Sequence, residues 1–79
     1  MNIKILGSGC ANCKKLFEMT NNTVKEMGSD AVVEKVEDMQ KIVSYGVMRT
    51  PAIVINEKVK SFGRIPKVEE IKKFIEEEK

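Results

Sequence analysis

The sequence predicts a small α/β protein whose elements follow in the order β-α-β-α-β-β-α. Three observations carry this prediction. Strand-like apolar runs alternate with segments of helical periodicity, and glycines or turn-forming pairs separate the two kinds of segment. The length of 79 residues is enough for one modest hydrophobic core. We therefore expect a single domain that covers residues 1–79.

The composition is that of an ordinary globular protein, with 42% hydrophobic and 33% charged residues. The 14 basic and 12 acidic residues are mixed along the chain, and a net charge of +2 is too balanced to indicate nucleic acid or an anionic membrane as a partner. No apolar run approaches a membrane span, and the N-terminus begins a strand at once. We expect a cytoplasmic monomer that binds neither nucleic acid nor a membrane.

The first predicted strand is Asn2–Leu6, and Gly7-Ser8-Gly9 forms a flexible turn into a helix. The helix extends from Cys10 to about Met27, because apolar positions recur there at steps of three and four. Its predicted buried face consists of Cys13, Leu16, Phe17, Thr20, Val24 and Met27. Gly28 stands where a helix C-cap is expected.

The middle of the chain predicts a second strand, Ala31–Glu37, which is rich in valine, and then a short helix. Asp38 can cap this helix, and Gly46 ends it. The apolar residues of the short helix are Met39, Ile42 and Val43.

The methionines that fall on helical faces, Met19, Met27 and Met39, are assigned to core packing rather than to a soft-metal site. Met48 lies in the segment that follows the short helix. A place for Met48 on an apolar rim near the cysteines stays open.

The C-terminal part predicts two strands and a helix. Ala52–Ile55 is apolar on both faces, which suits a central strand, and Asn56-Glu57 turns the chain into the polar edge strand Lys58–Phe62. The last helix has Pro66 in its first turn. Its predicted buried face consists of Val68, Ile71, Phe74 and Ile75. Because Glu76-Glu77-Glu78 opposes the helix dipole, we expect the last turn to fray.

The only two cysteines, Cys10 and Cys13, are three positions apart at the start of the first helix. Thiols at this spacing can close and reopen a disulfide, and in a cytosolic protein such a pair is more often catalytic or metal-binding than structural. Unpaired backbone N–H groups at a helix N-terminus favour the thiolate, which is the nucleophile. We expect Cys10 to attack a substrate disulfide and the more buried Cys13 to resolve the mixed disulfide. A Cys–His hydrolase is excluded, because the sequence has no histidine.

Thr50-Pro51 stands directly before the predicted central strand. Together with Cys10-Ala11-Asn12-Cys13 at the first strand-to-helix turn, it resembles the pattern of the thioredoxin superfamily, in particular its small thioredoxin-like or glutaredoxin-like redox-active disulfide proteins. The resemblance covers the whole chain. It implies a thioredoxin-like fold, with a central four-stranded mixed sheet flanked by three helices.

The resemblance also implies the composition of the site. Cys10 and Cys13 are the catalytic pair, the Thr50-Pro51 peptide bond is cis, and there is no metal and no cofactor beyond the redox-active Cys10–Cys13 disulfide. The implied substrate-binding residues are Gly9, Ala11, Asn12, Thr50 and Pro51. The implied activity is that of a thiol–disulfide oxidoreductase, which reduces protein disulfides or relays electrons between thiol proteins. Its partners would be disulfide-containing protein substrates and a thiol reductase.

Two departures from the family pattern concern the partners. Ser8-Gly9 precedes Cys10 where the main thioredoxin pattern has a tryptophan, so a tryptophan-lined docking surface is missing. Arg64-Ile65-Pro66 stands where glutaredoxins carry a glycine-plus-acidic pattern that helps to hold glutathione. The sequence therefore supports a glutathione site only weakly.

A soft-metal carrier is the alternative, because the segment from Gly7 to Cys13 also resembles the metal-binding loop of heavy-metal-associated domains. Two thiolates suit Cu(I) or zinc. Three features oppose this alternative: Ser8 replaces the methionine of that loop, the chain ends in a helix rather than a strand, and such a carrier has no use for Thr50-Pro51 before a central strand.

Overall fold

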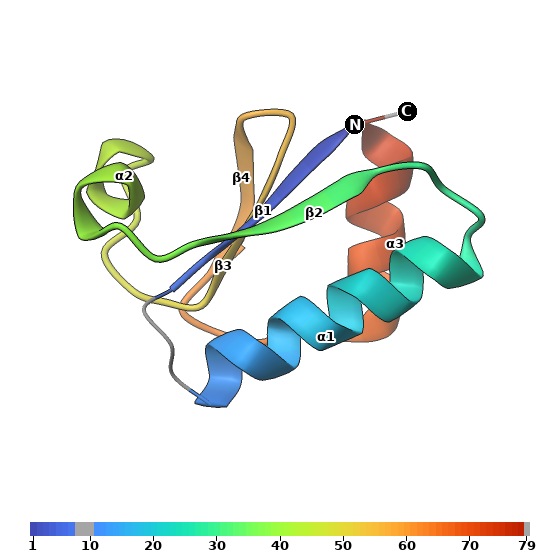
Figure 1. Ribbon diagram of the computed structural model, residues 1–79, viewed down its shortest axis with the longest axis horizontal. Coiled ribbons are helices and arrows are strands. Elements are labelled where there is room, and N and C mark those ends of the chain that lie inside the picture. The colour runs from blue at the N-terminus through green and yellow to red at the C-terminus, as the bar shows by residue number, and fades with distance from the viewer. Residues whose placement is uncertain (8–10, 79) are drawn as a thin grey trace.

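The computed structural model describes residues 1–7 and 11–78 (Figure 1). Elements follow in the predicted order, and the strand boundaries lie within one residue of those expected. The elements are β1 (Asn2–Leu6), α1 (Ala11–Glu26), β2 (Val32–Val36), α2 (Met39–Ser44), β3 (Ala52–Ile55), β4 (Lys58–Phe62) and α3 (Val68–Glu77). Within the described ranges, every helix is too short or too polar to cross a membrane.

The strands form a four-stranded sheet in the order β2-β1-β3-β4. Strand β1 runs parallel to β2 and antiparallel to β3, and β4 runs antiparallel to β3. The sheet is therefore mixed, as the family resemblance implied. The register pairs Leu6 with Ala52, so the C-terminal end of β1 lies beside the N-terminal end of β3. This arrangement brings the residues after β1 close to those before β3.

The two faces of the sheet carry different layers (Figure 1). Helices α1 and α3 cover one face, and the short helix α2 packs at the other. The buried residues of the first face are Ile3, Ile5, Leu16, Val24, Ile53, Ile55, Ile71 and Ile75. The buried residues of the second face are Leu6, Ile42, Val47, Ala52 and Val54. Most of the buried apolar surface therefore lies between the sheet and the two longer helices.

Helix α1 buries the face that its periodicity predicted. Met19 and Met27 are partly buried against the core, which confirms their assignment. Thr20 and Thr23 are fully or almost fully buried, and each hydroxyl donates a hydrogen bond to the carbonyl oxygen four residues earlier, at 2.8 and 2.7 Å. Thr23 was not expected in the core, but this bond satisfies its only polar side-chain group. Gly28 ends the helix with φ +64°, as a C-cap requires.

The assignment of Met39 to the core is wrong, because 60% of Met39 is exposed. Val43 is exposed to the same extent, and of the apolar residues of α2 only Ile42 is buried. The start of the helix is as predicted, since the Asp38 carboxylate accepts a hydrogen bond from the Gln40 N–H at 2.9 Å. Only Ile42 of this six-residue helix reaches the buried cluster on the second face of the sheet.

Helix α3 begins at Val68, two residues later than a first turn at Pro66 would place it. The Lys67 N–H donates to Glu70 Oε1 at 3.1 Å, which fixes this start. The fraying predicted for the last turn is not observed. Glu78 is half-buried and accepts a hydrogen bond from Lys60 Nζ at 2.8 Å, so the charge that opposes the helix dipole is neutralised by strand β4.

Candidate active site

Gly7, immediately after β1, is the point where the parts of the site meet. Its N–H donates to the carbonyl oxygen of Val36 at 2.9 Å, which holds it against β2. A Cβ atom built on Gly7 would overlap Sγ of Cys13 and lie 3.7 Å from Cβ of Thr50. Only glycine allows β1, the first turn of α1 and the segment before β3 to approach so closely. The sequence predicted merely a flexible turn here.

Cys13 lies in the first turn of α1 and is only 6% exposed. Its sulfur is disulfide-bonded. The neighbouring predicted substrate-binding residues Ala11 and Asn12 are exposed. The sequence predicted that Cys13 would be buried, and the structure shows this. Two residues of the predicted site, Gly9 and Cys10, lie outside the described residues.

The Thr50-Pro51 peptide bond is cis, which confirms that prediction. Pro51 is buried, and its carbonyl oxygen accepts a hydrogen bond from the Gly63 N–H at 3.0 Å. Thr50 is exposed. The structure therefore brings Cys13 and Thr50 to the same end of the sheet, through their shared contact with the Gly7 position.

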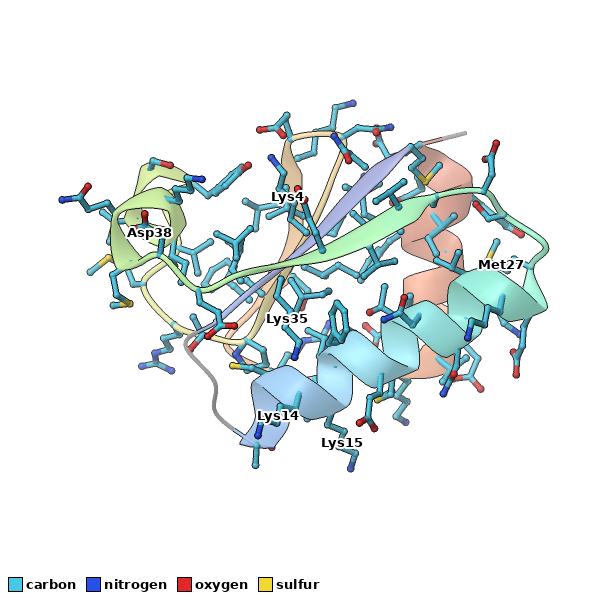
Figure 2. All side chains as sticks on the ribbon, viewed as in Figure 1. Lys4, Lys14, Lys15, Met27, Lys35 and Asp38 are labelled. Atoms are coloured by element: carbon cyan, nitrogen blue, oxygen red, sulfur yellow. The ribbon has the colours of Figure 1, made fainter. Side chains whose placement is uncertain are left out.

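A small cavity of about 90 Å³ lies against Cys13. Its lining residues are Ile5, Gly7, Cys13, Lys14, Lys35 and Glu37. Figure 2 shows Lys35 in the space between β2 and α1, where its Nζ lies 4.7 Å from the centroid of the Phe17 ring. This cation–π contact holds a positive charge beside the cavity. Sequence reasoning missed Lys35 and Glu37, because only the parallel pairing of β1 with β2 brings the end of β2 to the cysteine.

A second, larger concavity of about 290 Å³ lies between α2 and the segment that leads to Pro51. We call it the α2 groove; its lining residues are Met39, Ile42, Val43, Val47, Met48 and Thr50. Met48 is 88% exposed at its edge. Met48 therefore lies on an apolar rim, and Thr50 is the residue of the predicted site that this rim includes. Whether the rim reaches the cysteines, as the sequence left open, stays a prediction.

A hydrogen-bonded cluster on the α2 side of the sheet joins three elements. Lys4 Nζ donates to the Tyr45 hydroxyl at 2.9 Å and to Glu57 Oε1 at 2.8 Å, and the Tyr45 hydroxyl donates to Glu57 Oε2 at 2.9 Å. The bonds from Lys4 and Tyr45 hold the pKa of the Glu57 carboxyl below its usual value. The bonds that Lys4 makes to Glu57 and to Tyr45 raise the pKa of Lys4. The cluster ties the end of α2 to β1 and to the β3–β4 turn.

Comparison with known proteins identifies the family to which this chain belongs. The model of the family described as "Thioredoxin domain" matches residues 1–76. A protein named "Thioredoxin" from Methanothermobacter thermautotrophicus is 40% identical over 75 residues, which is 95% of this chain and 97% of that protein. A "Thioredoxin" from Methanocaldococcus jannaschii is 39% identical over 70 residues, or 89% of this chain and 80% of that protein. A "Probable Thioredoxin" from Methanothermobacter marburgensis is 36% identical over 72 residues, or 87% of this chain and 84% of that protein.

Proposed function

Because this chain belongs to the thioredoxin domain family and is a protein-disulfide oxidoreductase, we propose that Cys10 and Cys13 carry out its reaction. The observation that carries the proposal is the disulfide-bonded, buried Cys13, packed against Gly7 at the end of the sheet where the cis-proline loop begins. Since the sequence holds only two cysteines, the redox-active disulfide of the proposal is Cys10–Cys13. The family uses this disulfide in place of a separate cofactor.

In the proposed reaction, the dithiol form passes two electrons to a substrate disulfide. The Cys10 thiolate attacks one substrate sulfur, the substrate S–S bond breaks, and the first substrate thiolate leaves and takes up a proton. Cys13 then loses its proton and attacks the Cys10 sulfur, which closes the Cys10–Cys13 disulfide and releases the second substrate thiolate. A thiol reductase returns two electrons and two protons to the oxidised protein. Relay of electrons between thiol proteins uses the same two steps, with a protein dithiol in place of the reductase as the electron donor to the Cys10–Cys13 disulfide.

The substrate segment is proposed to lie across the backbone of Thr50 and Pro51, with Gly9, Ala11 and Asn12 on its other side. The exposure of Ala11, Asn12 and Thr50 supports this proposal, because all three are available to a partner. The proposed partners are disulfide-containing proteins and a thiol reductase. We further propose that residues 1–79 act as one domain, as a monomer, in the cytoplasm, where a reducing thiol pool keeps such a pair cycling.

The soft-metal carrier is not proposed, because the fold and the family both favour redox chemistry. The chain ends in helix α3, and the cis-proline loop precedes a central strand.

The test is a pair of cysteine variants in an insulin-reduction assay with dithiothreitol as donor. Cys10→Ser is expected to abolish the activity above the dithiothreitol background, because it removes the nucleophile. Cys13→Ser is expected to accumulate a mixed disulfide with the substrate, which mass spectrometry detects, because nothing resolves it. A Cys10→Ser protein that reduces insulin at the wild-type rate would refute the assignment.

A further inference from the structure

Helix α2 is attached to the sheet by few buried side chains. Ile42 is the one buried residue of the described helix Met39–Ser44, and Val47, which follows the helix, is buried beside it. A helix of six residues is not stable by itself, and an element with few buried contacts opens locally at a lower free energy than the core does. Polar contacts at the end of α2 therefore contribute a substantial share of its attachment to the sheet.

The Tyr45 hydroxyl supplies such contacts at the C-terminal end of α2. Tyr45 caps the helix and is half-buried, and its hydroxyl accepts a hydrogen bond from Lys4 Nζ at 2.9 Å and donates one to Glu57 Oε2 at 2.9 Å. Lys4 Nζ also lies 2.8 Å from Glu57 Oε1 and 5.7 Å from the centroid of the Tyr45 ring. Because Lys4 belongs to β1 and Glu57 to the β3–β4 turn, the three side chains join the end of α2 to two other parts of the sheet.

Glu57 has a backbone conformation that its residue type disfavours. Asn56 and Glu57 form the two-residue connection between β3 and β4, with φ of +51° and +68°. Hairpin turns with positive φ at both positions favour Asn-Gly, because a side chain is unfavourable at the second position. A strained residue persists where its surroundings over-determine its conformation. The hydrogen bonds that the Glu57 carboxylate accepts from Lys4 and Tyr45 are contacts that glycine would not make.

The end of α2 is also the start of the segment that leads to the proposed redox site. Residues 46–50 join Tyr45 to the cis-proline, and Cβ of Thr50 lies 3.7 Å from the Cβ position of Gly7. That position also borders Sγ of Cys13. A change in where α2 ends therefore changes where Thr50 lies relative to Cys13. The larger core lies on the other face of the sheet and does not depend on this change.

We propose that the cluster of Lys4, Tyr45 and Glu57 is a latch that holds α2 and residues 46–50 in the conformation to which a protein substrate binds. The three are positioning residues, since they act on the substrate only through the backbone of Thr50. When the latch is broken, α2 opens more often and a smaller fraction of the protein is ready to bind, so the apparent affinity falls by that fraction. This inference rests on the proposed function of the cysteines and adds a conformational control on substrate binding.

The first test is amide hydrogen exchange, measured by NMR, in the wild type and in Glu57→Gly. This variant removes the carboxylate and relieves the turn. Because the turn is strained whether α2 is closed or open, only the lost hydrogen bonds change the opening of α2. We expect the Ile42 and Gly46 amides, which are hydrogen-bonded at the two ends of α2, to exchange about fivefold faster. The Tm should not fall, because relief of the turn offsets the lost bonds.

Two further variants separate the latch from general changes in stability. Tyr45→Phe keeps the ring and removes only the hydroxyl, and the same two amides should exchange faster by at least as much as in Glu57→Gly. Glu78→Gln is the matched control, since the Glu78 carboxylate also binds two partners, both of them lysines of β4, but does so away from α2. It should leave the exchange of the two amides unchanged. Exchange at the wild-type rate in both Glu57→Gly and Tyr45→Phe would overturn the proposal.

Steady-state kinetics tests the effect on the reaction. With insulin as substrate, Tyr45→Phe should raise KM about twofold, the rise expected when the fraction of protein in the binding conformation falls by about half, and leave kcat unchanged. Bis(2-hydroxyethyl) disulfide is too small to depend on the position of α2, so the wild type and Tyr45→Phe should reduce it equally. An unchanged KM for insulin in Tyr45→Phe would overturn the positioning role, whereas a wild type that reduces neither disulfide would refute the proposed function instead.

Discussion

The two faces of the sheet use apolar residues in opposite ways. On the face covered by α1 and α3, apolar side chains form one buried core, in which Ile71 and Ile75 are completely buried. On the α2 face, the buried cluster is smaller, and Met39, Val43 and Met48 remain exposed beside it. The difference indicates that the first face supplies the stability of the fold, whereas the second combines a smaller core with a surface next to the redox site. The predictions below test this division.

The largest expected effect on the reaction is at Gly7, which lies next to both Cys13 and Thr50. Gly7→Val places a side chain where Sγ of Cys13 lies, so either the cysteine or the end of β1 must move. Because misplacement of reacting groups by about 1 Å costs on the order of 100-fold in rate, we expect insulin reduction to fall by about that factor. Circular dichroism should still show a folded protein.

Gly28→Ala is the control for Gly7→Val. Gly28 has φ +64° and nothing within 4 Å of its Cβ position, so alanine strains the backbone without touching the site. It should cost about 1 kcal/mol of unfolding free energy and leave the reduction rate unchanged. A Gly7→Val protein as active as Gly28→Ala would show that the close approach to Cys13 has no role in the reaction.

Next in size is the contrast in stability between the two faces. Ile75→Ala deletes a completely buried side chain from the first face and should cost about 2–5 kcal/mol of unfolding free energy. Val43→Ala, on the exposed part of the α2 face, should change that free energy by about 0.5 kcal/mol or less. Urea denaturation of both variants measures the two values. Comparable losses would mean that the α2 face contributes to the core as strongly as the first.

Acid should weaken the first face through Glu70, at the start of α3. Hydrogen bonds from Arg64 at 3.1 and 2.7 Å, and one from the Lys67 backbone N–H, lower the pKa of Glu70 from 4.5 to about 2. A depressed carboxyl pKa stabilises the fold above the unfolded value, and this contribution is lost as the pH falls from about 4.5 towards 2. We therefore expect the Tm to fall less between pH 5 and pH 2 in Glu70→Gln than in the wild type.

Glu69→Gln is the matched control for Glu70→Gln. Glu69 is an exposed neighbour in the same turn, and among the ion pairs of the described residues it has none. Its Tm profile should follow that of the wild type. If Glu69→Gln reduces the fall in Tm between pH 5 and pH 2 as much as Glu70→Gln does, the effect comes from the general charge of the helix start and not from the Arg64 contact.

The sequence predicted best those elements whose pattern depends on local periodicity. Ala52–Ile55 reads as a central strand and is completely buried, and the face of α3 that holds Ile71 and Ile75 follows from helical spacing alone. The family resemblance implied that the Cys10–Cys13 motif and Thr50-Pro51 share one site, and the structure places Cys13 and Thr50 near each other at the Gly7 position. The strand and the buried helix face can be predicted without knowing which distant residues pack against them.

What the sequence did not predict depends on long-range neighbours. The role of Gly7 follows from an atom of Cys13 that only the folded chain brings there. Helical spacing shows that Met39 and Ile42 share a side of α2, but not that only Ile42 reaches the buried cluster beneath the helix. Likewise Glu78 opposes its own helix dipole, and its half-buried position is explained by ion pairs with Lys58 and Lys60 on strand β4.

The smallest expected effect is a chemical one, and it reports on the groove methionines. Peroxide transfers one oxygen atom to a thioether sulfur, which is oxidised by two electrons to the sulfoxide, and water is released. Met48, at 88% exposure, should react first and Met39, at 60%, next, whereas Met1, Met19 and Met27 are partly buried against the core. Using the disulfide form of the protein protects the cysteines from oxidation. Peptide mass spectrometry after timed exposure to hydrogen peroxide gives the order.

Oxidation of the groove should then matter for protein substrates and not for stability. The sulfoxide is polar, so the oxidised protein should show a several-fold higher KM for insulin, with its Tm unchanged, because neither Met48 nor Met39 is in the core. Met48→Leu keeps the apolar surface and cannot be oxidised, so peroxide should raise its KM less. If Met19 or Met27 is oxidised as fast as Met48, then the two faces do not differ in accessibility as the structure shows. The division between a closely packed face and a partly exposed α2 face would then lose its physical basis.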